Sequence, residues 1–472
     1  MKSMEKIFDP KSIAIVGAST KENKFGGTSF LMRLQEAGYS GQLYPVNPQA
    51  EQIRGLKAFP DLNSLPEVPD LAIVCVAAKY VPAILQTCGE IGLKRVHILT
   101  SGFRELGTPA GNALELEVKN IADQFGLLIV GPNCMGPYCP SSGLTAWGAI
   151  PGMPGPLGII SQSGGITQRL TEYLYSMGVG VEKAVSMGNA TVLDGNEFLS
   201  LMADDPKIKV IAMYLENAGD GRRLFEHVRE INLKKPVIIL KGGISEAGAR
   251  TIISHTGSMA GSRPVWEAFF KQTGAIQVRS MEEWADTAIT LSLLPAPEGS
   301  GVFLASGGGG NSVINSDIFQ FEGLSVPELS AETMKLMQQR IPAIGSITGN
   351  PLDSFEIFSN PQHVSEIVDM VSKDPAISMI VIDRLIQRKA FHIMDMTDMT
   401  EKTVEILKPV SRLKPTVVTV ESDGGDLELG QKGTTMRRIF CENGIPAFPS
   451  TERAARALVN FHAYHTFKKS AE

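Results

Sequence analysis

The chain has 472 residues, enough for about three domains, and 43% apolar with 20% charged residues is typical of a globular protein. The net charge is −6 and the two signs are mixed along the chain, so no nucleic-acid-binding surface is predicted. No run of about 18 uncharged apolar residues is present in the sequence, so no membrane span is predicted. Asp9, Pro10 and Lys11 interrupt any signal-peptide pattern. The five scattered cysteines favour a reduced cytoplasmic location and indicate no metal site.

The first block of the chain alternates apolar runs with helical patterns. The runs include "SIAIVGAS", "LAIVCVAA", "VHILTSG" and "LLIVGPNC", and a helix is expected at about 27–37. Such runs predict a parallel sheet covered by helices on both faces. We therefore expect a doubly wound domain over residues 1–148, with ligands at the carboxyl ends of its strands.

The first strand ends in a glycine turn that is a candidate phosphate site. Gly17 and Ser19 follow the strand, and Lys24 precedes the expected helix, whose N-terminus favours anions. The turn is not G-x-G-x-x-G, and the second strand ends at Asn47 instead of the acid that binds the ribose of NAD. A phosphate-bearing nucleotide other than NAD fits better, although many such junctions bind nothing.

Two later turns carry small polar residues. "GPNCMG" places Asn133 at a strand end, where it either contacts a ligand or holds its own turn. "SQSGG" places Ser163 and Gly164 between an apolar run and a helical pattern. Ser163 can cap that helix while free N–H groups bind an anion, so the two interpretations are compatible.

Pro/Gly-rich stretches, "IPGMPGPLG" and "PAPEGSG", divide the rest of the chain into residues 149–296 and 297–472. Both blocks show, in the same order, an apolar run into Ser-Gly, then Gly-Asn with Leu-Asp, Asp-Pro and Lys-Pro. This order predicts an internal duplication of one α/β unit. The alternative is that a strand followed by a glycine turn is generic to such folds.

Only the first copy contains "ISHTGSMAG", which places His255 among small residues in an expected loop. Glu216 follows the apolar strand "VIAMYL", a neighbour of the strand before the histidine. A carboxylate that accepts one imidazole N–H fixes the tautomer and raises the basicity of the other nitrogen. The functional interpretation of the pair is a histidine that attacks phosphorus with Glu216 as its orienting partner. The alternatives, a solvated loop histidine and an exposed acid at a strand end, stay open on the residues alone.

The motifs "SIAIVGAS", "YPVNP", "GPNCMG", "SQSGG", "SMGN", "YLE", "KPVIILKGG" and "SEAGARTIISHTGSMAG" together resemble the α subunit of ADP-forming acyl-CoA synthetases, in the succinyl-CoA synthetase superfamily. The resemblance covers nearly the whole chain. It departs at "LASGGGGNS", where a glycine turn with proline is expected. It implies an α/β protein with an N-terminal Rossmann-like CoA-binding domain and two flavodoxin-like doubly wound domains.

The resemblance also implies roles for individual residues. His255 is the phosphorylated residue and Glu216 its orienting partner. The positions that match CoA-binding residues are Gly17, Ser19, Lys24 and Asn47. The positions expected near the acyl group or phosphate are Asn133, Ser163 and Gly164.

The implied reaction interconverts acyl-CoA, ADP and phosphate with carboxylic acid, ATP and CoA, through an acyl phosphate and a phosphohistidine. Neither an ATP-grasp block nor a G-x-x-x-x-G-K-[ST] loop is found in the chain. ATP or ADP with Mg²⁺ is therefore expected on a separate ATP-grasp β subunit, in an α₂β₂ hetero-oligomer. The alternative is a CoA-binding regulatory or scaffold protein of the same fold without ligase activity.

Overall fold

The computed structural model describes residues 2–21, 26–147, 152–256, 261–341, 347–354, 360–386, 398–422 and 426–471. The chain forms two compact units, one of Met1–Tyr175 with Gly180–Arg279 and one of Ser176–Val179 with Ser280–Glu472. In the described ranges, every helix is too short or too polar to cross a membrane.

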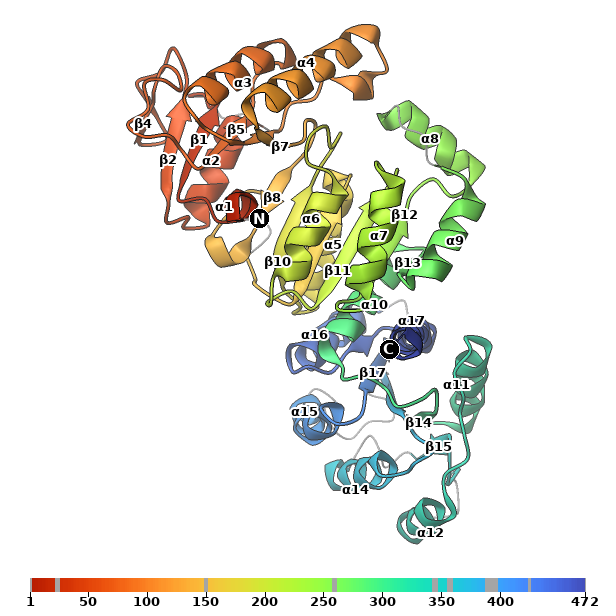
Figure 1. Ribbon diagram of the computed structural model, residues 1–472. Coiled ribbons are helices and arrows are strands. Elements are labelled where there is room, and N and C mark those ends of the chain that lie inside the picture. The colour runs from red at the N-terminus through yellow and green to blue at the C-terminus, as the bar shows by residue number, and fades with distance from the viewer. Residues whose placement is uncertain are drawn as a thin grey trace. The chain divides into compact units, whose positions relative to one another are not determined.

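The first sheet has the strand order β2-β1-β5-β6-β7, all parallel. Its strands are β1 (Ser12–Val16), β2 (Gln42–Val46), β5 (Leu71–Val74), β6 (Arg95–Ile98) and β7 (Leu128–Val130). The helices of this region are α1 (Lys2–Phe8), α2 (Gly27–Glu36), α3 (Val81–Glu90) and α4 (Pro109–Phe125), with the 3-10 helices η1 (Ala78–Tyr80) and η2 (Arg104–Leu106). A small hairpin, β3 (Gln52–Ile53) and β4 (Leu56–Lys57), forms a separate two-stranded sheet that contacts β2. Helices α3 and α4 pack together over this sheet (Figure 1). Strands β1 and β5 are buried along their whole length, as their continuous apolar runs predict.

The second sheet has the order β13-β12-β11-β9-β10-β8. Its strands are β8 (Gly136–Tyr138), β9 (Leu157–Ser161), β10 (Val181–Ser186), β11 (Val210–Leu215), β12 (Val237–Lys241) and β13 (Ile276–Val278). Only β8, which follows the first sheet in the chain, is antiparallel to its neighbour. Its helices are α5 (Gly164–Ser176), α6 (Gly195–Asp204), α7 (Gly221–Asn232), α8 (Glu246–Thr256) and α9 (Arg263–Thr273), with the 3-10 helix η3 (Pro140–Ser142) before β9. Helix α7 packs against both α6 and α9, which places these three on one face (Figure 1).

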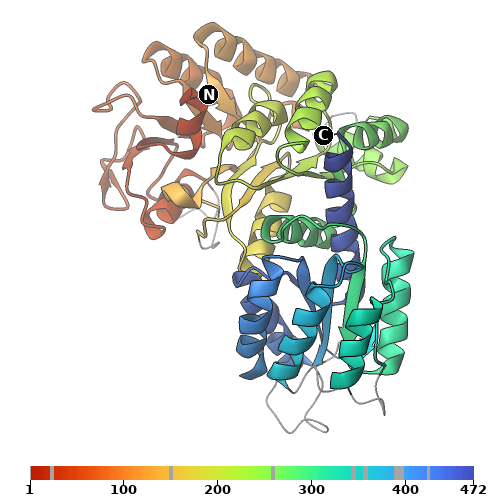
Figure 2. The same ribbon diagram turned by 60° about the horizontal axis from the view of Figure 1, so that its bottom comes forward.

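The third sheet lies in the other unit and has the order β15-β14-β16-β17-β18, all parallel. Its strands are β14 (Val302–Ser306), β15 (Leu352–Asp353), β16 (Met379–Ile386), β17 (Thr416–Ser422) and β18 (Ala447–Phe448). The helices are α10 (Met281–Leu293), α11 (Gly309–Phe321), α12 (Ala331–Arg340), α14 (Pro361–Ser372), α15 (Asp398–Ser411), α16 (Leu427–Glu442) and α17 (Thr451–Ala471). Helix α15 packs between α14 and α16, and the long α17 packs against α10 and α11 (Figure 2).

Each set of five parallel strands places its first strand second from one end and continues through the third, fourth and fifth strands on the other side. In the second sheet this order begins at β9, because the antiparallel β8 is added at the edge beside β10. This is the flavodoxin-like order of doubly wound sheets, and ligands of such folds bind at the carboxyl ends of the strands. The predicted α/β class is confirmed. The helix expected at 27–37 is confirmed as α2. The domain boundaries at residues 148 and 296 stay predictions.

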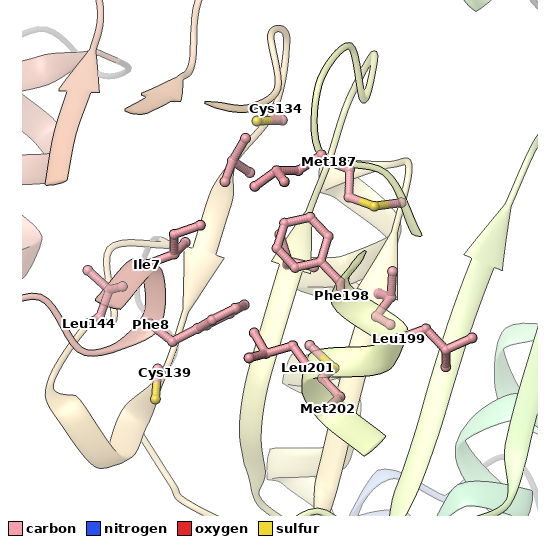
Figure 3. Close-up of a cluster of buried hydrophobic side chains, with 14 of the residues drawn as sticks. Ile7, Phe8, Cys134, Cys139, Leu144, Met187, Phe198, Leu199, Leu201 and Met202 are labelled. Carbon is pink, nitrogen blue, oxygen red and sulfur yellow. The ribbon is translucent and has the colours of Figure 1, made fainter. Parts of the chain in front are cut away.

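A shared hydrophobic cluster joins the first and second sheets into one unit. Ile7 and Phe8 of α1 pack into a cluster with residues of α6 (Figure 3). The rings of Phe8 and Phe198 meet edge to face, with centroids 6.1 Å apart. A rigid connection of this kind allows one binding site to draw residues from both sheets.

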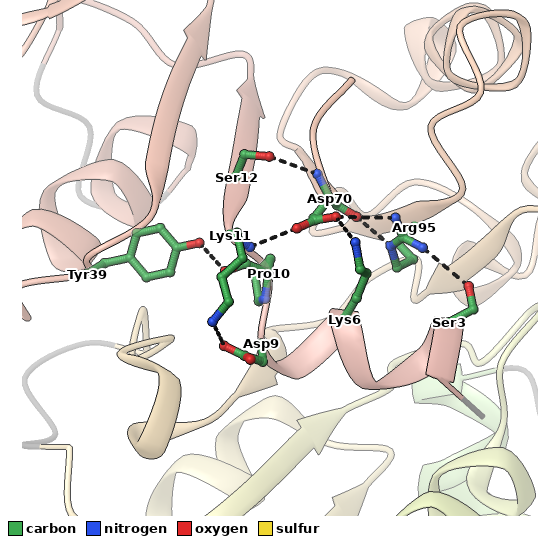
Figure 4. Close-up of polar contacts among 9 residues, drawn as sticks. All are labelled: Ser3, Lys6, Asp9, Pro10, Lys11, Ser12, Tyr39, Asp70 and Arg95. Carbon is green, nitrogen blue, oxygen red and sulfur yellow. Dashed lines mark hydrogen bonds and ion pairs between the residues drawn. The ribbon is translucent and has the colours of Figure 1, made fainter. Parts of the chain in front are cut away.

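A polar cluster anchors α1 at the amino end of the first sheet (Figure 4). Asp70 accepts from Lys6 Nζ at 2.7 Å and from the Lys11 backbone N–H at 2.9 Å. Arg95 Nε donates to the Asp70 carbonyl at 2.6 Å. Burial raises the pKa of Asp70, but these donors outweigh it and hold the net pKa below its ordinary value.

The strand order does not by itself support a duplication, because all three sheets share it. Better support comes from two of the shared motifs. Lys235 and Lys414, each before a proline, donate through Nζ to the carbonyl oxygens of Asp205 and Asp374 respectively. The Gly-Asn and Leu-Asp correspondence is wrong, because Asp194 caps α6 whereas Asp353 lies in β15.

Candidate active site

The turn after β1 requires glycine at its first position. Gly17 has φ +93°, and a Cβ there would lie 2.6 Å from the carbonyl oxygen of Cys75. The Gly17 N–H donates to the Val46 carbonyl at 3.1 Å, which ties the ends of β1 and β2 together. The backbone is therefore free to approach a ligand where no side chain intervenes.

Ser19 and Asn47 meet at the same turn. The Asn47 side chain donates to the Ala18 carbonyl at 2.7 Å, and the Ser19 N–H donates to Thr28 Oγ1 of α2 at 2.9 Å. Three of the four positions predicted for CoA are thus brought together. The fourth, Lys24, lies outside the described residues.

A cavity of about 240 Å³ opens beside this turn. Gly17 and Val46 line it together with Asp61, which the sequence analysis did not single out because it lies in an irregular stretch. Asp61 Oδ1 accepts two hydrogen bonds from Ser64, from the backbone N–H at 2.9 Å and from Oγ at 2.7 Å. This acid is engaged within its own turn.

The segment containing Asn133 lies over the start of α5. A Cβ on Gly164 would come within 2.6 Å of Met135 Cγ, so only glycine fits at the first residue of the helix. Asn133 adopts φ +60°, donates through its backbone to the Thr100 carbonyl at 2.9 Å, and reaches Asn189 Oδ1 with Nδ2 at 3.5 Å. The predicted residues Asn133, Ser163 and Gly164 therefore come from adjacent segments.

The N-terminus of α5 differs from those of α6 and α7. Asp194 and Asp220 cap α6 and α7, and so place a carboxylate at each of these helix starts. Helix α5 begins after the neutral Ser163, whose Oγ accepts from the Ile166 N–H at 3.4 Å. Gly165 has open space beside it. Of these three helices, only α5 offers unneutralised N–H groups to an anion.

Gln162, which sequence reasoning passed over inside "SQSGG", connects the ends of β9 and β11. Its Oε1 accepts from the backbone N–H groups of Glu216 at 2.6 Å and Asn217 at 3.1 Å. Glu216 is buried, and Tyr214 OH donates to its Oε1 at 3.3 Å. Burial, and then the charge of Glu216, raise the pKa of Tyr214 above its ordinary value.

Lys241 was also missed, although a lysine at the end of a buried apolar strand is a signal in the sequence. It is buried, and its Nζ donates to the Glu216 carbonyl at 2.8 Å and to its neighbour Gly242. Its ammonium also lies 5.1 Å from the centre of the Trp266 ring. Burial lowers the pKa of Lys241 to about 8, and the charge of Glu216 only partly opposes this.

The position of His255 corrects one prediction. The expected loop is helical through Thr256, so His255 belongs to the last turn of α8, and residues 257–260 and the His255 side chain lie outside the described residues. Between Gly248 and Gly257 the sequence contains neither glycine nor proline, which explains the extension. Strands β11 and β12 are paired neighbours, as predicted. A contact between His255 and Glu216 stays a prediction.

A cavity of about 590 Å³ lies along the same edge of the second sheet. Its polar lining includes Gln162, Asn189 and Asn217, which connects it to the segments around α5. Trp266 and Phe269 of α9 contribute apolar walls. Its size falls within the range of roughly 300–1,000 Å³ that is usual for small-molecule sites.

Two successive stretches of the chain match protein-family models. Residues 11–140 match a CoA binding domain. Residues 154–291 match a succinyl-CoA ligase like flavodoxin domain. These assignments agree with the glycine turn after β1 and with the neutral helix N-terminus after β9.

Full-length relatives extend this result. The chain is 35% identical over 471 residues to the α subunit of ADP-forming acetate–CoA ligase I of Pyrococcus furiosus, covering 99% of this chain and 98% of that protein. It is 33% identical to the longer ADP-forming acetate–CoA ligase I of Archaeoglobus fulgidus, of which it covers 63%. The dinucleotide forming acetyl-coenzyme A synthetase 1 of Ca. Korarchaeum cryptofilum, solved with phosphate and ADP, matches at TM-score 0.89 and 29% identity, covering 100% and 99% of the two chains. These matches favour the ligase subunit over a regulatory or scaffold protein, and the chain belongs to the family of α subunits of ADP-forming acetate–CoA ligases.

Proposed function

We propose that this chain is the acyl-transferring subunit of an ADP-forming acyl-CoA synthetase, with acid and phosphate handled at the start of α5. The observation that carries this proposal is the neutral N-terminus of α5, with Gly164 pressed against Met135 and open space at Gly165. Helix N-termini of this kind bind phosphate through free N–H groups and the helix dipole.

CoA would bind along the carboxyl edge of the first sheet. The turn of Gly17, Ser19 and Asn47 and the adjoining cavity of about 240 Å³ suit its nucleotide end. Lys24 adds a positive charge to this part of the sequence. The thioester end would extend toward Asn133, Ser163 and Gly164, because the segment of Asn133 lies over α5.

The chemistry proceeds in three transfers. An oxygen of phosphate attacks the thioester carbonyl, the C–S bond breaks, and CoA leaves as thiolate with an acyl phosphate remaining. A nitrogen of His255 then attacks phosphorus, the P–O bond to the acyl group breaks, and the carboxylate leaves. Finally the terminal oxygen of ADP attacks the phosphohistidine, the N–P bond breaks, and ATP is released. Activation of an acid runs through the same steps in reverse.

This chain contributes position and charge to these steps. Phosphoryl transfer depends mainly on alignment and on stabilisation of charge, which the N–H groups of α5 can supply. Glu216 would accept a hydrogen bond from one imidazole nitrogen and leave the other unprotonated for attack. Its backbone is fixed for that task by Gln162.

We infer that the nucleotide and its Mg²⁺ bind to a separate ATP-grasp β subunit, in an α₂β₂ assembly. The Pyrococcus relative is named as a subunit, and the longer Archaeoglobus relative extends well beyond the length matched here. The sequence has no P-loop of its own. Rigorously purified chain should therefore show no ATP-dependent acyl-CoA synthesis, and synthesis by the chain alone would refute this division of labour.

The central test supplies the chain with acetyl-CoA and inorganic [³²P]phosphate. A phosphohistidine is expected, recognised by a label that is lost in acid and survives in alkali. Calorimetric titration with CoA and with NAD tests the first domain separately. Tighter binding of NAD than of CoA would contradict the proposed CoA site, and a label that survives acid would contradict the phosphohistidine.

A further inference from the structure

We propose that Lys241 is a positioning residue for the phosphohistidine step, holding Glu216 and both ends of the His255-bearing segment in one arrangement. This inference rests on the proposed function. The segment meant is the stretch between the end of β12 and the start of α9. Lys241 is the last residue of β12, and Trp266 lies in the first turn of α9.

The contacts of Lys241 reach three separate elements. Its Nζ donates to the carbonyl of Glu216 at the end of β11, to Gly242 after its own strand, and lies over the Trp266 ring at 5.1 Å. The contact with Trp266 closes the base of the histidine-bearing segment. The contact with Glu216 fixes the predicted partner of His255 to the same point.

Three side chains hold Glu216 through its N–H, its carbonyl and its carboxylate. Its N–H donates to Gln162 Oε1 at 2.6 Å, its carbonyl accepts from Lys241, and its carboxylate accepts from Tyr214 OH. Gln162 belongs to the turn that leads into α5, so these contacts connect the predicted phosphate site with the base of the segment. Loss of one anchor should misplace the carboxylate relative to the imidazole, and a misplacement of about 1 Å can cost roughly 10²-fold in rate.

The ammonium charge of Lys241 is essential to this arrangement. The attraction to Trp266 is a cation–π contact, and hydrogen bonds from a charged donor are stronger than those from a neutral one. Among the side chains that the structure describes, the titratable groups that face Lys241 are Glu216, whose charge favours the ammonium, and Tyr214, which packs against Gly242. With a pKa of about 8, Lys241 loses its proton as the pH rises through that value, and the anchor weakens on the alkaline side.

The test compares Lys241→Met, Lys241→Arg and wild type in labelling from acetyl-CoA and [³²P]phosphate between pH 6 and pH 10. Lys241→Met should label at least about tenfold more slowly at pH 7, because a misplaced carboxylate slows the transfer. Lys241→Arg should keep most of the rate, and the decline in labelling rate expected for wild type near pH 8 should disappear because arginine stays charged. CoA titration should be the same in all three proteins.

Lys235→Met provides the matched control. Lys235 is a partly buried lysine of the same domain that also donates to backbone carbonyls, at Met202 and Asp205. It lies before β12 instead of at its end, so its loss should leave the labelling rate per folded molecule unchanged. Each of three results would overturn the inference. They are a wild-type labelling rate in Lys241→Met, an alkaline decline of the rate in Lys241→Arg like that of wild type, and a loss of labelling rate in Lys235→Met equal to that in Lys241→Met. If wild type itself forms no phosphohistidine, the proposed function fails instead.

Discussion

In both flavodoxin-like domains, a lysine in front of the fourth strand donates to the carbonyl of an aspartate in front of the third. Lys235 reaches Asp205 in one domain, and Lys414 reaches Asp374 in the other. Each aspartate also closes its own turn by accepting from the residue two positions later, Lys207 or Ala376, at 2.9 Å. The amino ends of the two sheets are therefore built alike.

The carboxyl ends of the same two sheets differ. In the second sheet, Glu216 directly follows β11 and Lys241 is the last residue of β12. These two strands precede His255 in the chain. In the third sheet, Glu421 near the end of β17 is used within the domain, where it accepts from the backbone and hydroxyl of Thr451. From this difference we expect the amino ends to serve as scaffold and the proposed phosphoryl transfer to take place at the carboxyl end of the second sheet.

The sharpest test of this contrast removes the histidine. His255→Ala should abolish the phosphohistidine label and overall ligation, because no second nucleophile is predicted on this edge. His227→Ala is the control, since His227 lies in α7 of the same domain and contacts Ser200. Label formation is followed with [³²P]phosphate and acetyl-CoA. Exchange of the ATP γ-phosphate by His255→Ala with the β subunit, acid and CoA present would break the mechanism.

A smaller effect is expected from Glu216→Gln. The amide keeps the shape of the side chain but removes the charge that favours the reactive tautomer, so labelling should slow by about 10²- to 10⁴-fold, the usual worth of a positioned acid–base group. Single-turnover labelling measures this rate. CoA affinity should not change, because the turn at Gly17 is untouched.

Glu182→Gln is the matched control for that variant. Glu182 is also buried in the second domain, but it pairs with Lys207 and Ser141. It should affect stability without slowing the transfer. Equal rates for Glu216→Gln and wild type would leave Glu216 without its predicted role.

Particular residues show what the sequence could and could not predict. Continuous apolar runs located the strands β1, β5, β9 and β12, because burial on both faces demands them. The pairing of β8 with β10 was not predictable, since three residues after a glycine turn carry no period. The extent of α8 was missed because small residues looked like a loop.

The candidate site was predicted unevenly for a related reason. Asn133, Ser163 and Gly164 were found because glycine turns at strand ends mark them locally. Lys241 and Gln162 were missed because their roles depend on partners from other strands and helices, Glu216 and Trp266. Local motifs reveal where a backbone turns, but not which buried side chains connect one turn to another.

The shared scaffold is tested by Lys235→Met and Lys414→Met. Each removes charged hydrogen bonds to backbone carbonyls, which should lower the free energy of unfolding by about 2–3 kcal/mol. The two losses should be similar, because each lysine donates to two backbone carbonyls, one of them that of the corresponding aspartate. Urea-induced unfolding measures both, with the exposed Lys234→Met as a control expected to show no change. A large loss of unfolding free energy for only one of the two lysine variants would contradict the shared scaffold.

The smallest effect is expected at the amino end of the first sheet, outside both copies. Asp70→Asn removes the charge that binds Lys6, the Lys11 N–H and Arg95, and should lower the free energy of unfolding at pH 7 by about 1–2 kcal/mol. Because the pKa of Asp70 in the folded protein lies below its unfolded value, its contribution is present above pH 4 and disappears as the pH falls through the folded pKa. The difference in free energy of unfolding between wild type and Asp70→Asn should therefore become smaller in acid.

Asp9→Asn separates this effect from a general loss of surface charge. Asp9 pairs with Lys11 at 2.7 Å, but both side chains are exposed, so the pair should contribute little. Urea unfolding at pH 7 and at about pH 3.5, near the unfolded pKa of a carboxyl group, distinguishes the two variants. The anchoring of α1 by the Asp70 cluster would be contradicted if Asp9→Asn and Asp70→Asn lost equal free energies of unfolding. It would also be contradicted if the loss caused by Asp70→Asn became larger in acid. Labelling should be unaffected in both variants, because chemistry confined to the carboxyl end of the second sheet does not depend on a charge at the amino end of the first.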